Sequence, residues 1–303
     1  MLSEIFYWLL DMSISASIAG CVILLLGKIR NIPRRIIHVL WVIPLFRMWI
    51  PIGLSSKYSL MTQISKYTTR SVTVYRGFPE LSMTNFVMAA EDYFPITYKV
   101  DALGTVYRIA GIVWIIIMAA LLLIFSMVYA VTKWDIKDAR HFRDHVYISG
   151  KAESPAVYGI IRPKIVIPEL YDLKDYKYIL MHENAHIRRK DNLWRIIAVI
   201  TVSFHWFNPL SWLFLRCFLQ NLEHACDETV LAQCGEEGRK GYAASLLNCA
   251  ESRNLYAATF GGAKIRTRID RILSYKKLSA FSAAFFVVFS IYIGYVLLTN
   301  AVS

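Results

Sequence analysis

The segment from Met181 to Asn192 reads M-H-E-N-A-H-I-R-R-K-D-N and contains the pattern H-E-x-x-H. On an α-helix, residues four positions apart lie on one face, one turn from each other. His182 and His186 can therefore bind the same tetrahedral metal ion. Glu183 then lies beside the open coordination position, where a carboxylate can accept a proton from metal-bound water. Taken alone, the pattern also fits an ordinary helix that carries two exposed histidines.

A second pattern, E-H-A-C-D from Glu223 to Asp227, favours the metal site. Glu223 and Asp227 are again four positions apart on one helical face. A metallopeptidase of this type needs a third protein ligand, commonly a glutamate on a later helix, and Glu223 fits that role. It also needs an acceptor for the second ring N–H of a ligand histidine, and Asp227 fits that role. Cys226 is an alternative thiolate ligand, but two histidines and a glutamate already complete the catalytic set.

The composition indicates an integral membrane protein. The chain has 303 residues, 56% of them hydrophobic, and several apolar runs reach the length that spans a bilayer. Its net charge is +12. Nucleic-acid binding is one interpretation of that charge. However, the basic residues lie beside the apolar runs, as expected for cytoplasmic loops next to membrane lipid, so we expect no direct contact with nucleic acid.

Four runs are predicted to span the membrane: Ile5–Leu26, Ile36–Leu54, Ile109–Val131 and Ala280–Leu298. The basic loop after the first run should be cytoplasmic, which places both termini outside. The first run lacks a basic n-region and a small-residue cleavage site, so we expect it to remain as an anchor. Residues 55–108 are predicted to be the only sizeable external segment. The sequence does not decide whether this segment is a sensor or a plain cap on the helices.

Asp11 and Arg47 are charged residues inside the first two runs, each about two turns from the outer end. An ion pair between them and snorkelling of both side chains to the outer interface are equally good interpretations. The cysteines number five, and none lies in the external segment. A disulfide framework is therefore not expected.

A further apolar run, Leu193 to Leu219, follows the H-E-x-x-H segment. A complete span would separate Glu223 from His182 by about 30 Å, whereas both must lie about 2 Å from one zinc ion. Asn208-Pro209 supplies a break, and the helix before it would be about 22 Å long, too short to cross. We therefore expect residues 193–219 to form a helical hairpin that dips into the membrane from the inside and returns.

Short strands are predicted before the H-E-x-x-H segment, at Val146–Ile148, Ala156–Ile161 and Ile165–Ile167. The last two form either a structural hairpin or an edge on which an extended peptide docks. The predicted organisation is an N-terminal membrane hairpin (1–54), an external loop (55–108), a third transmembrane helix (109–132), a cytoplasmic domain (133–279) with its membrane-dipping hairpin (193–219), and a fourth transmembrane helix with a short tail (280–303).

These motifs together resemble the BlaR/MecR-type membrane metallopeptidases, the transducers of beta-lactam resistance signalling. The resemblance covers about residues 2–298. It is carried by four segments: residues 182–191, Trp206-Phe207-Asn208-Pro209, residues 223–228 and G-I-I-R-P-K-I-V-I-P from Gly159 to Pro168.

The resemblance implies an α-helical integral membrane protein of the bacterial cytoplasmic membrane. It would have four transmembrane helices, a re-entrant hairpin and a cytoplasmic α+β gluzincin-like domain. It implies one zinc ion bound by His182, His186 and Glu223, with Glu183 as catalytic base. It also implies that the active site faces the cytoplasm and that a cytoplasmic transcriptional repressor, or the peptidase itself, is cleaved after an external signal.

One feature departs from the family pattern. Beta-lactam receptors of the family carry a penicillin-binding sensor domain after the last helix, whereas Thr299–Ser303 alone follow here. Ser274–Lys277 fits S-x-x-K by spacing, but it lies on the predicted cytoplasmic side. The sequence therefore leaves open whether beta-lactams are sensed directly by acylation. A second copy of the chain or a separate sensor protein is left open as a partner.

Two other functions remain open from the sequence. The first is a housekeeping membrane zinc protease that resembles the CAAX-processing and heat-shock families, which share H-E-x-x-H and a later E-x-x-x-D. The second is a non-catalytic receptor in which zinc is structural. His205 and His224 are candidates for holding the oxyanion of a peptidase reaction, and the sequence favours neither.

Overall fold

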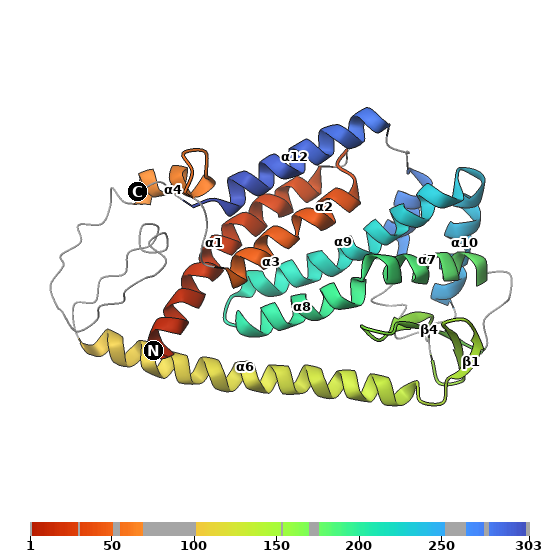
Figure 1. The fold of residues 1–303 in the computed structure, drawn as a ribbon, viewed down its shortest axis with the longest axis horizontal. Helices are drawn as coiled ribbons and strands as arrows, with labels where there is room; N and C mark the ends of the chain where they lie inside the picture. The colour runs from red at the N-terminus through yellow and green to blue at the C-terminus, as the bar shows by residue number, and fades with distance from the viewer. Residues whose placement is uncertain are drawn as a thin grey trace. The chain divides into compact units, whose positions relative to one another are not determined.

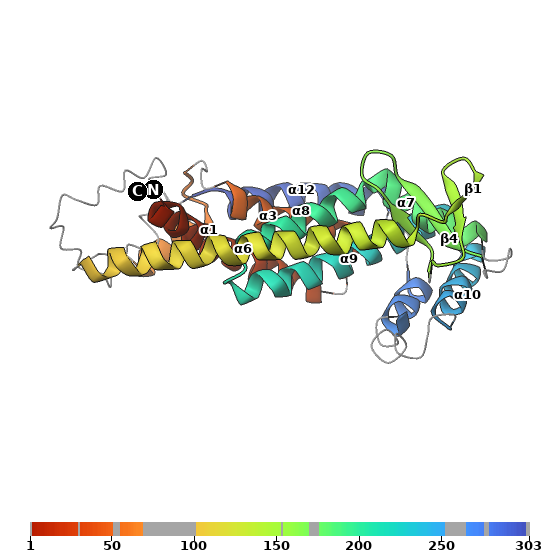
Figure 2. The ribbon, with the colours of Figure 1, turned by 90° about the horizontal axis from the view of Figure 1, so that it is seen from below.

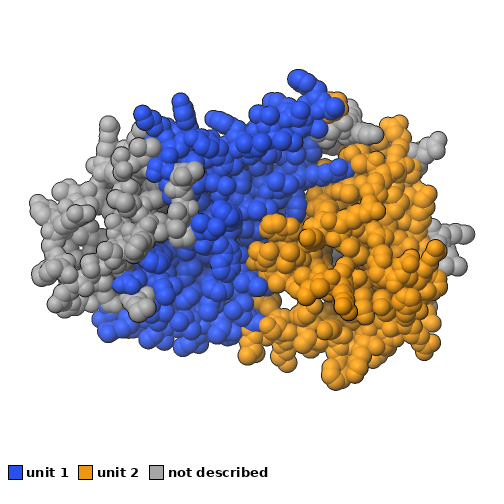
Figure 3. Space-filling view, viewed as in Figure 1, with its two compact units in different colours: residues 1–122, 198–218, 280–303 blue, residues 123–197, 219–279 orange. Residues whose placement is uncertain are grey.

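The computed structural model describes residues 2–29, 31–50, 55–68, 101–152, 154–169, 176–251, 265–275 and 279–300. The chain forms two compact units, each assembled from segments that are distant in the sequence (Figure 3). Unit 1 contains Met1–Leu122, Ala198–Phe218 and Ala280–Ser303, and unit 2 contains Leu123–Ile197 and Leu219–Ser279.

Unit 1 is helical (Figure 1). In it, α1 packs against α2 and α3, and α12 packs against α2, α3 and α4. Parts of three more helices, α6, α8 and α9, belong to this unit. The bounds are α1 (Leu2–Lys28), α2 (Arg34–Leu40), α3 (Val42–Trp49), α4 (Leu60–Thr68), α6 (Asp101–Asp135), α8 (Asp191–Phe204), α9 (Pro209–Cys234) and α12 (Ala280–Leu298).

Within the described residues, three helices are long and apolar enough to cross a membrane: Glu4–Lys28, Thr105–Trp134 and Ala280–Leu298. They correspond to the first, third and fourth predicted spans. The predicted second span, Ile36–Leu54, is not one continuous helix there. It is divided at Trp41 into α2 and α3, because Pro44 has no N–H to donate to the carbonyl of Leu40 and its ring crowds that carbonyl. Residues 51–54, and residues 69–100 of the predicted external segment, lie outside the described residues.

The predicted break at Asn208-Pro209 is confirmed as the turn between α8 and α9. The Asn208 side-chain amide donates to the hydroxyls of Ser13 and Ser17, each at 2.8 Å. Its carbonyl oxygen accepts the backbone N–H of Leu210 at 2.9 Å, which caps α9. Proline at the first position of α9 needs no such partner. Asn208 therefore both starts α9 and fixes this turn to α1.

Asp11 and Arg47 are both buried in unit 1, with 5% and 6% of their surface exposed. The Arg47 guanidinium donates to the carbonyl of Leu298 at 2.8 Å. Burial of both residues favours side chains that face the helix bundle over side chains that snorkel to an interface. The ion pair between them stays a prediction.

Unit 2 contains a four-stranded sheet with the order β1-β2-β4-β3, which lies near the C-terminal end of α6 (Figure 2). β2 and β4 are parallel and the other neighbours are antiparallel. The three predicted strands correspond to β2, β3 and β4, and β1 was not predicted. The strand bounds are β1 (Arg140–Arg143), β2 (Val146–Ser149), β3 (Ala156–Tyr158) and β4 (Lys164–Pro168).

Helix α7 (Tyr176–Arg189) carries the H-E-x-x-H pattern and is covered on two sides. On one side Tyr176, Leu180 and Ile187 pack on the sheet residues Val146, Ile165 and Ile167. On the other side Ala185, Tyr178 and Met181 join a cluster formed by α9, α10 (Glu237–Glu251) and residues 265–273: Cys226, Val230, Leu231, Tyr242, Ala243 and Ile272. The spacing of these two apolar faces is helical. Together they bury the strip of α7 that contains the histidines.

Gly20 provides a test of the packing in unit 1. A Cβ atom at Gly20 would overlap the ring of Phe214, whereas a Cβ atom at Gly294 would lie 3.9 Å from Ile43, an ordinary contact. We expect Gly20→Ala to destabilise the protein by about 1–3 kcal/mol through overpacking, and Gly294→Ala to be neutral. The measurement is thermal unfolding of the detergent-solubilised full chain.

The double variant Gly20→Ala, Phe214→Leu should recover part of the lost stability, because leucine vacates the space that the new methyl group needs. Equal unfolding temperatures for Gly20→Ala and Gly294→Ala would show that α1 and α9 do not approach closely at this point.

Candidate metal centre

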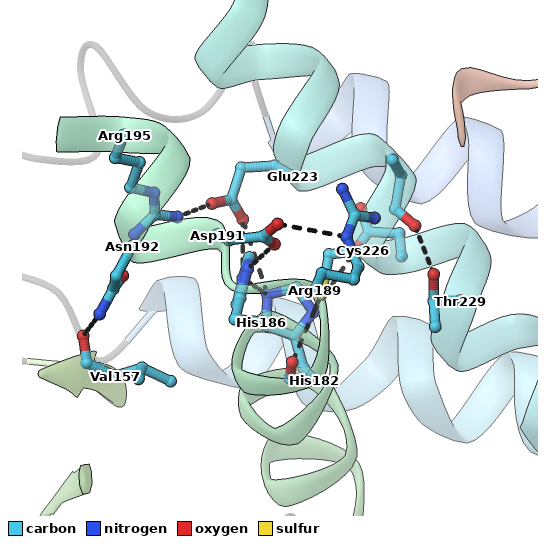
Figure 4. A network of polar contacts seen from close by, with 12 residues as sticks. Val157, His182, His186, Arg189, Asp191, Asn192, Arg195, Glu223, Cys226 and Thr229 are labelled. Atoms are coloured by element: carbon cyan, nitrogen blue, oxygen red, sulfur yellow. Dashed lines mark hydrogen bonds and ion pairs between the residues drawn. The ribbon is translucent and has the colours of Figure 1, made fainter. Parts of the chain in front are cut away.

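Three side chains from two helices of unit 2 converge on one point. His182 Nε2 and His186 Nε2 of α7 lie 3.1 Å apart. Glu223 Oε2 of α9 lies 3.6 Å from the first nitrogen and 3.8 Å from the second. Figure 4 shows the two rings and the carboxylate pointing toward one another. The structure therefore brings together three of the residues that the sequence predicts as metal ligands.

These separations fit a shared cation. Ligand atoms about 2.0–2.1 Å from a tetrahedral zinc ion lie about 3.3–3.4 Å from one another. The three distances lie close to that value. Two neutral imidazoles and one carboxylate are also the donor set of catalytic zinc sites with one open position. His182, His186 and Glu223 could thus hold one zinc ion.

Cys226 defines a second group that could hold a metal, since ligand atoms of His182, His186 and Cys226 lie within 4.8 Å of one another. The Cys226 sulfur, however, lies 3.5 Å from His182 Nδ1, on the opposite edge of the ring from Nε2. It also donates to the carbonyl of His182 at 3.4 Å. Burial, together with the charge of Asp227, raises the pKa of the Cys226 thiol well above its usual value. The geometry therefore favours Glu223 as the third ligand.

His186 is held by a buried carboxylate. Its Nδ1 lies 2.6 Å from Asp191 Oδ2, and Asp191 is fully buried. A carboxylate only accepts, so Nδ1 carries the proton and Nε2 keeps its lone pair. Asp191 also accepts from Arg189 Nε at 3.3 Å. Between α7 and α8, Lys190 has φ of 55°, which turns the chain so that the first residue of α8 reaches back to α7.

His182 is held through a tyrosine. Its Nδ1 lies 2.8 Å from the hydroxyl of Tyr242, which in turn donates to Asp227 Oδ1 at 2.6 Å. The direct distance from His182 Nδ1 to Asp227 Oδ1 is 3.5 Å. The hydroxyl therefore accepts a hydrogen bond from Nδ1–H, and His182 Nε2 is left free for a metal. Asp227 lies beside His182 as the sequence predicts, but the shorter path runs through Tyr242.

Asp227 is itself neutralised by an arginine. Arg268 donates to both Asp227 oxygens, at 2.8 and 2.7 Å. Burial alone would raise the pKa of the Asp227 carboxyl, but the charge and hydrogen bonds of Arg268, with contributions from His182 and Tyr242, hold it below its usual value. The buried pair is thus ionised and its hydrogen bonds are fixed.

The two glutamates of the site have opposite pKa shifts. Burial, together with the neighbouring charge of Glu223, raises the pKa of Glu183 to about 7, although the charges of His186 and two arginines act to lower it. For Glu223 burial acts in the same direction, but the neighbouring His182, His186 and Arg268 outweigh it and hold the pKa of this carboxyl well below its usual value. Glu223 is therefore a carboxylate, and Glu183 has the pKa expected of a group that accepts and returns a proton near neutral pH.

Several residues of the site were not predicted from the sequence. Asp191 lies within the quoted H-E-x-x-H segment, five positions after His186, and could have been found from its position. Tyr242, Arg268 and Arg195 have no fixed spacing to the motifs, so no local signal indicates them. Of the two histidine candidates for the oxyanion, His205 lies in unit 1, where its Nε2 is 3.1 Å from the carbonyl oxygen of Met48.

Two histidines one helical turn apart, with a carboxylate from another helix, form an arrangement typical of metallopeptidases. Comparison with protein families agrees with this class. A model of the BlaR1 peptidase M56 family matches residues 7–272. The chain belongs to this family of membrane metallopeptidases.

Three relatives are similar over part of the chain. The methicillin resistance mecR1 protein of Staphylococcus aureus is 27% identical over 115 residues, which are 36% of this chain and 20% of that protein. The regulatory protein BlaR1 of Bacillus licheniformis is 32% identical over 100 residues, 31% of this chain and 17% of that protein. BlaR1 of Staphylococcus aureus is 29% identical over 121 residues, 37% and 21% of the two chains. The matches thus span about a fifth of each relative.

Tyr242→Phe tests the tyrosine link. The change removes one hydroxyl, leaves Asp227 without its short donor and leaves His182 Nδ1 without its acceptor. We expect metal affinity to fall by about 10–100-fold, as for other changes in groups that orient ligand histidines. Competition between the purified protein and a chromophoric chelator measures it.

Tyr178→Phe is the matched control, since Tyr178 packs near Tyr242, with ring centroids 6.2 Å apart, without contacting a ligand histidine in the described contacts. An unchanged affinity in Tyr242→Phe would mean that the hydroxyl does not orient His182.

Proposed function

We propose that this protein is a membrane-embedded zinc endopeptidase that transduces a signal by cleaving a cytoplasmic transcriptional repressor, itself, or both. The observation that carries the proposal is the convergence of His182, His186 and Glu223, with separations of 3.1–3.8 Å. Both Nδ1 atoms are engaged by other groups, so both Nε2 atoms are directed at the shared point. Membership in the M56 family supports the metallopeptidase chemistry.

The protein's own residues then have distinct roles. His182, His186 and Glu223 would hold zinc, which supplies polarisation of a carbonyl group and a lowered pKa of water. Glu183 accepts the proton of the attacking water and passes it to the leaving amine. Its buried position keeps its pKa near 7 in the metal-free protein, and a neighbouring cation would lower it. Asp191 and Tyr242 keep the ligand rings in the required tautomer.

We propose the predicted topology for the membrane segments: four spans with both termini outside, the 193–219 hairpin entering from the inside, and the gluzincin-like domain in the cytoplasm. The C-terminal end of α6 has the residues of a membrane–water interface. Trp134 is 72% exposed, and the ammonium of Lys137 lies over its ring at 5.3 Å. Tryptophan and lysine are enriched at such boundaries. The first strand follows within a few residues, at Arg140.

The signalling role is supported by the relatives. They include a methicillin resistance protein and two regulatory proteins. A soluble repressor is a substrate that a cytoplasmic metal centre could reach, and its loss would induce antibiotic-resistance or cell-envelope genes. A second copy of the chain or a separate sensor protein could supply the external signal. Two other functions give different results in the experiment below. One is a housekeeping protease without a repressor partner, and the other is a non-catalytic receptor with structural zinc.

The test is co-expression of the full chain with candidate repressors. We expect cleavage of one of them, or of the chain itself, with the wild type and with Glu236→Gln, a control in which the changed side chain is 93% exposed. Glu183→Gln should abolish cleavage, because the amide cannot accept a proton, yet retain one zinc ion per chain in elemental analysis.

Cleavage of other membrane proteins but of no repressor would favour the housekeeping protease. Signalling that survives Glu183→Gln unaltered would favour the non-catalytic receptor and end the peptidase proposal.

A further inference from the structure

The first turn of α8 connects three parts of the metal centre. Asp191 bonds to His186 of α7. Asn192 donates to the carbonyls of Val157 and of Gly159, at 2.9 and 3.1 Å, along the outer edge of β3. Arg195, one turn after Asn192, bonds to Glu223 of α9. Figure 4 shows these side chains leaving the same turn in different directions. This turn therefore positions groups from three separate elements.

Arg195 bonds to only one of the two Glu223 oxygens, and the other oxygen faces the histidines. Its Nη2 donates to Oε1 at 2.6 Å. The other oxygen, Oε2, is the one that lies 3.6 and 3.8 Å from the two histidine nitrogens. When one carboxylate oxygen accepts a charge-assisted hydrogen bond, only the other oxygen remains available to a metal cation. The geometry is that of a carboxylate prepared to bind through a single oxygen.

The second arginine at the site cannot replace this contact. Arg268 approaches Glu223 Oε2 with its Nη1 at 3.8 Å, but its shorter bonds go to both oxygens of Asp227. Its position is thereby fixed on the ligand side of the carboxylate. The Arg195 side chain is 37% exposed and borders solvent. Without Arg195, the nearest remaining cation would draw the carboxylate through the oxygen intended for the metal.

We propose that Arg195 is a positioning residue that holds Glu223 as a single-oxygen ligand and keeps Oε2 available to the metal. This inference rests on the proposed function, because it assigns Glu223 as the third ligand. It follows that the guanidinium group itself is required to orient Glu223. Lysine carries the same charge, but its ammonium group lies on a flexible side chain and lacks the planar, fixed N–H geometry of arginine. Lysine at position 195 should preserve the positive charge but only part of the orientation of the Glu223 carboxylate.

The experiment uses the full chain in detergent with Arg195→Met, Arg195→Lys and the control Arg188→Met, which removes an exposed arginine from the end of α7. Zinc affinity is measured by chelator competition, and the coordination is measured from the visible absorption spectrum of the Co²⁺-loaded protein. We expect Arg195→Met to bind zinc about 10–100-fold more weakly and to show an altered Co²⁺ spectrum. Arg195→Lys should lie between it and the wild type, and Arg188→Met should equal the wild type.

Wild-type affinity and an unchanged Co²⁺ spectrum in Arg195→Met would overturn the proposal, as would equal losses in Arg195→Met and Arg188→Met. If Arg195→Met does not elute as a folded species in size-exclusion chromatography, Arg195→Lys decides by the same two readouts. The proposed function fails separately: a wild-type protein that binds no zinc ends both ideas, whereas a wild type that binds zinc and cleaves while Arg195→Met is unaltered ends only this one.

Discussion

The constraint on which unit 2 depends is the burial of several ionisable groups around one point. His182, His186, Glu183 and Asp227 are each less than 9% exposed. Transfer of unpaired charges from water into such a site would cost several kcal/mol each. This cost is offset by a connected set of hydrogen bonds and ion pairs to partners that include arginines and a tyrosine. A metal ion at the shared point would add the positive charge that two histidines and a carboxylate are arranged to receive.

That constraint explains why the elements are placed as they are. α7 must present its histidines at one-turn spacing, so it is covered on one side by the sheet and on the other by the α9 and α10 cluster. The α8 turn must follow α7 at once, because Asp191 is needed on His186. α9 must return to the same point with Glu223, and the turn at Asn208 permits this. The order of these elements is thus the one that the proposed ligand set requires.

Part of this structure follows from sequence patterns because helical periodicity is local. H-E-x-x-H and E-x-x-x-D fix which side chains share a face, so the three candidate ligands and Asp227 could be predicted to meet. Tyr242 and Arg268 could not, since their contacts with Asp227 depend on tertiary packing. The strand β1 was missed because its residues, R-H-F-R, are charged and exposed. The division of the second predicted span was foreseeable from Pro44, because a proline in a helix interior removes one backbone hydrogen bond and kinks or breaks the helix.

The position of Glu223 beside both Nε2 atoms favours it over Cys226 as the third ligand of the proposed metal site, because Cys226 lies next to Nδ1 of His182 instead. X-ray absorption at the zinc edge of the purified full chain measures that choice most directly. We expect one zinc ion with only nitrogen and oxygen neighbours at about 2.0–2.1 Å. A sulfur neighbour at about 2.3 Å, or a protein that holds no zinc, would contradict it.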